Sequence, residues 1–195
     1  MNVSFTFWGM ISLFAVAFLE AAGGPVPYEL VFAGALFLID QGALGFWQAY
    51  GLLVCTNLFG NLCGYVLAAQ LGRGVIRYGL LRSRSFKRIW REVSKRFRNG
   101  FVPILIFMRW TGFGFGPALW LSGIRRIPLT RFLGVAAVMN IIWIAVWLAV
   151  GQRVVLWAKA QQVPLAFALA AVFFFLAAIQ WMWKPMWKPD RNKRG

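Results

Sequence analysis

The sequence contains no histidine and only five acidic residues among its 195 positions. The lack of histidine argues against haem, against catalytic zinc and against acid–base catalysis by imidazole. Cysteine is scarce as well, since Cys55 and Cys63 are the only two. On one helix these side chains would lie about 12 Å apart along the axis, which is too far for a disulfide. We therefore expect neither a metal nor a cofactor.

Apolar and basic residues are abundant where acidic residues are few. Hydrophobic residues make up 61% of the chain, and 21 Lys and Arg against 5 Asp and Glu give a formal net charge of +16. A soluble domain with this apolar fraction would have too little polar surface. A nucleic-acid-binding protein would not carry apolar runs of membrane-spanning length. The composition therefore predicts an all-α integral membrane protein of one domain, with basic residues in its loops and no nucleic acid partner.

The apolar runs differ in whether they are continuous. Residues 51–71, 132–150 and 164–183 are unbroken, and each has the length of about 20 residues that crosses about 30 Å of hydrocarbon. Residues 5–39 and 101–124 are interrupted in the middle. Each half of the second region, at about 10 residues, forms only about 15 Å of helix, which reaches the midplane. We therefore expect about three transmembrane helices and two opposed re-entrant helical hairpins.

Basic residues orient the chain across the membrane. Residues 72–100 contain ten Lys and Arg and one acid, and residues 184–195 contain five more basic residues. Both segments are expected to be cytoplasmic, because cytoplasmic loops carry an excess of positive charge. If residues 101–124 enter and return on the cytoplasmic side, Arg125, Arg126 and the C-terminus remain there, whereas a full crossing would place them outside. The charge pattern therefore predicts a multi-pass protein of the inner (plasma) membrane with a cytoplasmic C-terminus.

Each hairpin is followed by a span, so the chain is expected to form an inverted repeat within a single membrane domain, residues 1–195. Such repeats place substrate sites near the bilayer midplane. Aromatic and aliphatic residues at helical spacing in residues 84–98 also predict a basic amphipathic helix on the inner leaflet. The expected units are the first repeat at 1–71, a cytoplasmic basic amphipathic linker at 72–100, the second repeat at 101–151, the last transmembrane helix at 164–183 and a basic cytoplasmic tail at 184–195.

Three charged residues, Glu20, Glu29 and Arg109, lie in otherwise apolar stretches. A charge near the bilayer centre costs about 2.5–3.5 kcal/mol, and intramembrane ionisable residues usually mark substrate or ion pathways. The simpler alternative is that these residues lie at the interface or only tie the hairpin tips together. If Arg109 pairs with one carboxylate, the other is left in low-dielectric surroundings that favour its neutral form. One of the two glutamates is therefore expected to bind and release protons.

Helix-breaking residues gather in both hairpins. Such breaks survive in a membrane only inside protein or beside a water-filled cavity, so they favour a site at the facing hairpin tips. Arg125 and Arg126 could contact a lipid phosphate, and anchoring by positive charge explains them equally well. The intramembrane amides of Asn57, Asn61 and Asn140 are expected to form hydrogen bonds between helices. The breaks are expected at Pro25, Pro27, Gly112, Gly114, Gly116 and Pro117.

The order of several motifs resembles the DedA family, also described as SNARE-associated or VTT-domain proteins. The first half is similar to that family's acidic residue followed by Pro-x-Pro-Gly-Glu and an Ala-Gly pair, and to its later Gly-Tyr…Gly-Arg span. The resemblance covers roughly residues 14 to 151. The matching residues are Glu20, Pro25, Pro27, Glu29, Ala33, Gly34, Gly64, Tyr65, Gly72, Arg73, Arg109, Arg125, Arg126, Arg131, Phe132 and Asn140.

The resemblance implies two facing re-entrant hairpins and the movement of lipids across the membrane, with Glu20 and Glu29 as an essential acidic pair and Arg109 as the first essential arginine. Bacterial members are associated with returning undecaprenyl phosphate to the cytoplasmic face, and other members with phospholipid scrambling. Phe115 departs from the pattern, because the family has a second arginine at this position. A phosphate headgroup would meet one fixed cation fewer, unless an arginine after the second hairpin substitutes.

These features together predict a lipid translocase, a flippase or scramblase, for a phosphate-bearing lipid such as undecaprenyl phosphate or a phospholipid. Membrane lipids are the expected partners, protons are a candidate second partner, and a homo-oligomer is compatible with the sequence. Two alternatives remain, which are a proton-coupled transporter or exchanger of small ions and a non-transporting membrane assembly factor. An enzyme is not expected, because the chain has neither histidine nor a nucleophile elbow.

Overall fold

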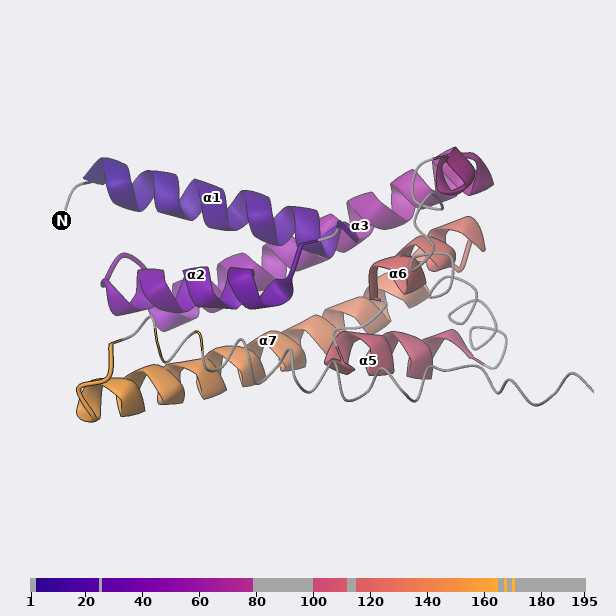
Figure 1. Ribbon diagram of the computed structural model, residues 1–195. Helices are drawn as coiled ribbons and strands as arrows, with labels where there is room; N and C mark the ends of the chain where they lie inside the picture. The colour runs from indigo at the N-terminus through magenta and orange to yellow at the C-terminus, as the bar shows by residue number, and fades with distance from the viewer. Residues whose placement is uncertain are drawn as a thin grey trace, which may run out of the picture.

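The computed structural model describes residues 3–24, 26–78, 100–111, 115–164, 167 and 170. These residues form an all-helical structure with no strand among them, which confirms the predicted class. The predicted amphipathic helix at 84–98 and tail at 184–195, and nearly all of the last predicted span, lie outside the described residues. The helices in Figure 1 are α1 (Val3–Ala21), α2 (Tyr28–Asp40), α3 (Phe46–Tyr78), α5 (Phe101–Thr111), α6 (Phe115–Ile124) and α7 (Leu129–Ala160).

Two of these helices are long and apolar enough to cross a membrane, namely Phe46–Gly72 of α3 and Leu129–Ala160. With 27 and 32 residues they measure about 40 and 48 Å. The apolar runs at 51–71 and 132–150 fall inside them. At Gly72 the backbone of α3 leaves helical geometry, with φ 58° and ψ −147°, a conformation that glycine adopts without a Cβ clash. The apolar part of α3 therefore ends where the basic linker begins.

Both interrupted regions form helical hairpins. Residues 22–27 join α1 to α2, and residues 112–114 join α5 to α6. Because α5 and α6 have 11 and 10 residues, the second region is divided close to its middle, as its sequence predicts. Gly116 and Pro117 lie in the first turn of α6 rather than in the connection. Proline is tolerated there because an N–H in the first turn of a helix has no partner within the helix.

The pair α1 and α2 and the pair α5 and α6 lie at opposite ends of the described structure, and the end of α1 and the start of α6 lie toward its middle (Figure 1). The turn of the first hairpin touches the start of α6, because a Cβ added at Gly116 would lie 2.9 Å from the carbonyl oxygen of Gly23. The indole N–H of Trp120 in α6 also donates a hydrogen bond of 3.1 Å to the carbonyl oxygen of Ala22. These contacts join the first hairpin to the second through their tips.

α3 and α7 run antiparallel past both hairpins (Figure 1). The Tyr50 hydroxyl donates to the Ile141 carbonyl oxygen of α7 at 3.2 Å, and the Tyr65 hydroxyl of α3 donates to the carbonyl oxygen of Ile127, which lies just before α7. Two apolar clusters surround the hairpins, and α3 and α7 contribute to both. Their members include Leu13, Phe32, Leu53, Trp143 and Leu148 around the first hairpin, and Leu105, Leu119, Phe132, Ala136 and Met139 around the second.

An ion pair marks the end of the molecule at which the first hairpin opens. Lys159 in the last turn of α7 lies 2.5 Å from the carboxylate of Asp40, the last residue of α2. Arg125 and Arg126 lie in the turn between α6 and α7, at the opposite end of α7. The two ends of the structure therefore carry different charged residues.

Candidate functional site at the hairpin tips

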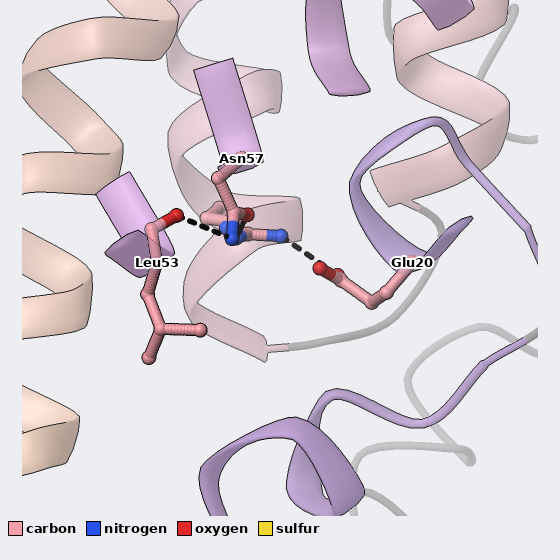
Figure 2. Close-up of polar contacts among 4 residues, drawn as sticks. Glu20, Leu53 and Asn57 are labelled. Carbon is pink, nitrogen blue, oxygen red and sulfur yellow. Dashed lines mark hydrogen bonds and ion pairs between the residues drawn. The ribbon is translucent and has the colours of Figure 1, made fainter. Parts of the chain in front are cut away.

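Arg109 occupies the last turn of α5, and its side chain is only 2% exposed. Its Nη1 group donates a hydrogen bond of 2.9 Å to Oε1 of Glu20, which is 10% exposed in the last turn of α1 (Figure 2). The C-terminal end of a helix is a favourable place for a cation and an unfavourable one for an anion. The carboxylate of Glu20 therefore relies on Arg109 for charge compensation, and this contact brings the two hairpin tips together.

Asn57 of α3 is the second partner of this arginine. The Nη2 group of Arg109 donates to Oδ1 of Asn57, and Nδ2 of Asn57 donates to the Leu53 carbonyl oxygen one turn earlier at 3.1 Å (Figure 2). The second bond fixes the orientation of the amide, since it leaves Oδ1 as the group that faces the arginine. A single guanidinium thus links α1, α3 and α5.

Two aromatic rings cover the guanidinium. Its carbon lies 3.9 Å from the ring centroid of Trp143 in α7 and 4.6 Å from that of Phe115 in α6. A cation over an aromatic face is attracted by the ring quadrupole, and more strongly where water is excluded. Trp143 is held in turn by edge contacts with the rings of Tyr28 and Phe32 in α2, at centroid distances of 5.2 and 5.1 Å. Every helix in Figure 1 therefore contributes to the position of Arg109, directly or through Trp143.

A buried ion pair is an energetically costly way to hold the hairpin tips together. Removing two charges from water costs about as much as their attraction returns, so a buried ion pair adds little stability compared with apolar residues of the same volume. A charge within the hydrocarbon of a membrane carries a further cost. A merely structural contact between the hairpin tips would be served better by apolar side chains.

The other predicted site residues are distributed along the structure. Glu29 is half-buried in the first turn of α2, where the helix N-terminus favours a negative charge. Pro27 precedes that turn as the N-cap residue. Arg125 and Arg126 are exposed beyond the far end of α6, about 15 Å along that helix from the tip. The structure therefore does not bring these two arginines to Arg109 as substitutes for a second cation. Pro25, Gly112 and Gly114 lie outside the described residues.

Sequence reasoning left Asn57 and Trp143 out of the site. The sequence indicated Asn57 only as one of several amides expected to bond between helices, and nothing in it distinguished Trp143 from the other ten tryptophans. The spacing of four residues from Leu53 to Asn57 and Asn61 does indicate one face of α3. No local pattern indicates that this face meets Arg109, because the two residues are 52 positions apart.

A family model described as the VTT domain matches residues 26–153, which is more than half of the chain. Proteins with this domain are membrane-associated, are generally of the transporter type rather than enzymes, and have functions linked to membrane transport or lipids. No curated protein and no solved structure matches the chain. The matched segment contains α2, α3, α5, α6 and most of α7, and thus the partners of Arg109 other than Glu20. The chain belongs to the VTT-domain family, which is the DedA or SNARE-associated family.

Proposed function

We propose that this chain is a lipid translocase of the inner (plasma) membrane, a flippase or scramblase for a lipid with a phosphate-bearing headgroup. The observation that carries the proposal is the buried pair of Glu20 and Arg109, which joins the tips of two hairpins from opposite ends of the molecule. A charged headgroup needs a polar binding site to cross hydrocarbon, whereas the acyl chains of the lipid can remain in the bilayer. The hairpin tips are suited to form that binding site.

In this proposal the two hairpins are re-entrant and form an inverted repeat with α3 and α7. The lengths of α5 and α6 correspond to about 15 Å, half of the hydrocarbon thickness of about 30 Å. The exposed rings of Trp8, Trp47 and Trp157 lie toward the end at which the first hairpin opens, and tryptophans of this kind form belts at the membrane surface. Arg125 and Arg126 then mark the cytoplasmic end, and the C-terminus is cytoplasmic.

Transport proceeds in this proposal by exchange of one oxyanion for another on Arg109. The guanidinium binds a carboxylate and a phosphate with the same planar donor geometry, so a headgroup phosphate can replace Glu20. A carboxylate that loses its buried cation is strongly disfavoured in the charged form, and Glu20 therefore takes up a proton. When that proton leaves, the carboxylate competes again for Arg109 and releases the headgroup. Proton binding is thereby coupled to lipid binding.

The test is translocation of fluorescent phospholipids and of a polyprenyl phosphate in proteoliposomes. Wild type is compared with Glu20→Gln, Glu29→Gln and Arg109→Ala, and with Arg153→Ala as a control at an exposed arginine of α7. The proposal expects translocation by wild type and by the control, and its loss in the three site variants while they remain folded. Absence of lipid translocation by wild type under any ion gradient would refute it.

The same experiment distinguishes the alternative functions. A proton-coupled transporter of small ions would give ion flux that depends on Arg109 and Glu20, with no movement of lipid. A membrane assembly factor would give neither ion flux nor lipid translocation, and neutralising Glu20 would leave its activity in cells unchanged.

A further inference from the structure

Two buried asparagines have no hydrogen-bond partner among the described residues. Asn61 in α3 and Asn140 in α7 are both 0% exposed, and both the nitrogen and the oxygen of each amide are unpaired within that part of the chain. Each amide can donate two hydrogen bonds and accept more. An unpaired buried amide is costly, and a leucine of similar volume would avoid that cost. The hydrogen-bonding capacity of these two amides is thus available to a group outside the described part of the chain.

Helix register places each amide one turn from a residue that contacts Arg109. Asn61 follows Asn57 by four residues, and Asn140 precedes Trp143 by three, so each lies one turn from a residue that contacts the guanidinium. Because both side chains are completely buried, neither amide faces the outer surface of the described structure. The Nε atom of Arg109 is a third buried donor without a partner in the described residues.

The charge of the site limits which ligands these donors can bind. Within the described part of the chain, Arg109 is the only fully buried cation, and Glu20 neutralises it. A ligand that replaces the carboxylate keeps the site neutral only if it brings one negative charge. A phosphodiester carries one charge, whereas a phosphate monoester carries about 1.5 to 2 at pH 7. The additional charge of the monoester would be buried without a partner, which is strongly unfavourable.

We propose that Asn61 and Asn140 complete the headgroup site beside Arg109 by donating hydrogen bonds to phosphate oxygens. Because these two amides are uncharged, the site selects a phosphodiester lipid over a phosphate monoester. The inference rests on the proposed function, because it assumes that a lipid headgroup reaches the hairpin tips. It goes beyond that function in naming the headgroup class and two specificity-determining residues.

The first test separates binding from folding. Asn61→Leu and Asn140→Leu should each raise about tenfold the mole fraction of phosphatidylglycerol at half-maximal translocation, as expected for one hydrogen bond to a charged group. Their melting temperatures in detergent should stay equal or rise, because an unpaired buried amide is removed. Val138→Leu, at an exposed position of the same helix as Asn140, is the control. Unchanged half-saturation, or activity lost only in parallel with melting temperature, overturns the assignment of these residues.

The second test compares phosphatidylglycerol with phosphatidic acid, a diester and a monoester that can carry identical acyl chains. Wild type should translocate the diester at least about tenfold more efficiently at limiting lipid, because the second charge of the monoester lacks a cation. Phe115→Arg adds a cation where a ring now lies 4.6 Å from Arg109, and should shift the preference toward the monoester. Equal translocation of both lipids by wild type overturns the selectivity while the proposed function stands. If wild type translocates neither of these lipids and no other lipid, both the selectivity and the proposed function are overturned.

Discussion

Arg109 and Glu20 form an ion pair of 2.9 Å although they are 89 positions apart in the sequence. Both lie in the last turns of their helices, α5 and α1, and those helices approach each other from opposite ends of the molecule (Figure 1). The pair is therefore a property of the meeting of two hairpins rather than of either hairpin. Anything that separates the hairpin tips separates these charges, and this relationship underlies several of the predictions below.

Removing one partner of the pair should destabilise the protein more than removing both. Arg109→Ala leaves the carboxylate of Glu20 buried without its cation, and such a loss costs about 3–5 kcal/mol. The double variant Glu20→Gln with Arg109→Met should recover most of that loss, because no buried charge remains, yet it should not transport. Thermal denaturation in detergent measures the stabilities, and the translocation assay measures activity. If the double variant is as unstable as Arg109→Ala, the unpaired charge of Glu20 is not the cause of the lost stability.

Close approach of the hairpin tips should depend on Gly116. A Cβ at this position would lie 2.9 Å from the carbonyl oxygen of Gly23, whose φ of 87° itself favours glycine. Gly116→Ala should therefore cost about 1–3 kcal/mol as an overpacked contact and should lower translocation. Gly134→Ala in α7 is the matched control, since a Cβ there meets nothing within 4 Å, and it should stabilise the helix by up to about 1 kcal/mol. Equal effects of the two substitutions would argue against contact between the tips.

The proposed orientation predicts which residues a membrane-impermeant maleimide can reach in intact cells. After Cys55 and Cys63 are replaced by alanine, a cysteine at Lys159 should be labelled from outside, because it lies at the end where the first hairpin opens. A cysteine at Arg126 should be labelled only after the membrane is permeabilised. The opposite pattern would invert the orientation, and labelling of both in intact cells would contradict a crossing by α7.

The ion pair of Asp40 and Lys159, in which the aspartate is 11% exposed and the lysine is largely in solvent, should contribute little to stability. Its lysine is 56% exposed at the open end of the first hairpin, and exposed pairs contribute about 0–1 kcal/mol. Asp40→Asn should therefore change the melting temperature far less than Arg109→Ala. A large loss on Asp40→Asn would mean that the contact between the ends of α2 and α7 determines the packing of the first hairpin.

Features that depend on local sequence could be predicted from the sequence alone. The division of the second hairpin into two short helices follows from glycines and proline near the centre of an apolar run, and the structure has helices of 11 and 10 residues there. The apolar part of α3 likewise ends at Gly72. Run length and helix breaking involve neighbouring residues, so a single sequence contains the information. The first turn of α6 begins before Gly116 and Pro117 because proline is compatible with a helix start.

Only the tertiary structure decided which groups meet. The sequence identified Glu20, Glu29 and Arg109 as charges in apolar surroundings, and it determined the helical membrane class through composition and periodicity. It did not determine that Glu20 is paired with Arg109, that Asn57 accepts from the same guanidinium, or that Trp143 covers it. These contacts join residues on α1, α3, α5 and α7, and their geometry depends on how four helices pack against one another. A pattern along one chain specifies which face of a helix is buried, whereas the partner of that face is fixed only when all the helices are assembled.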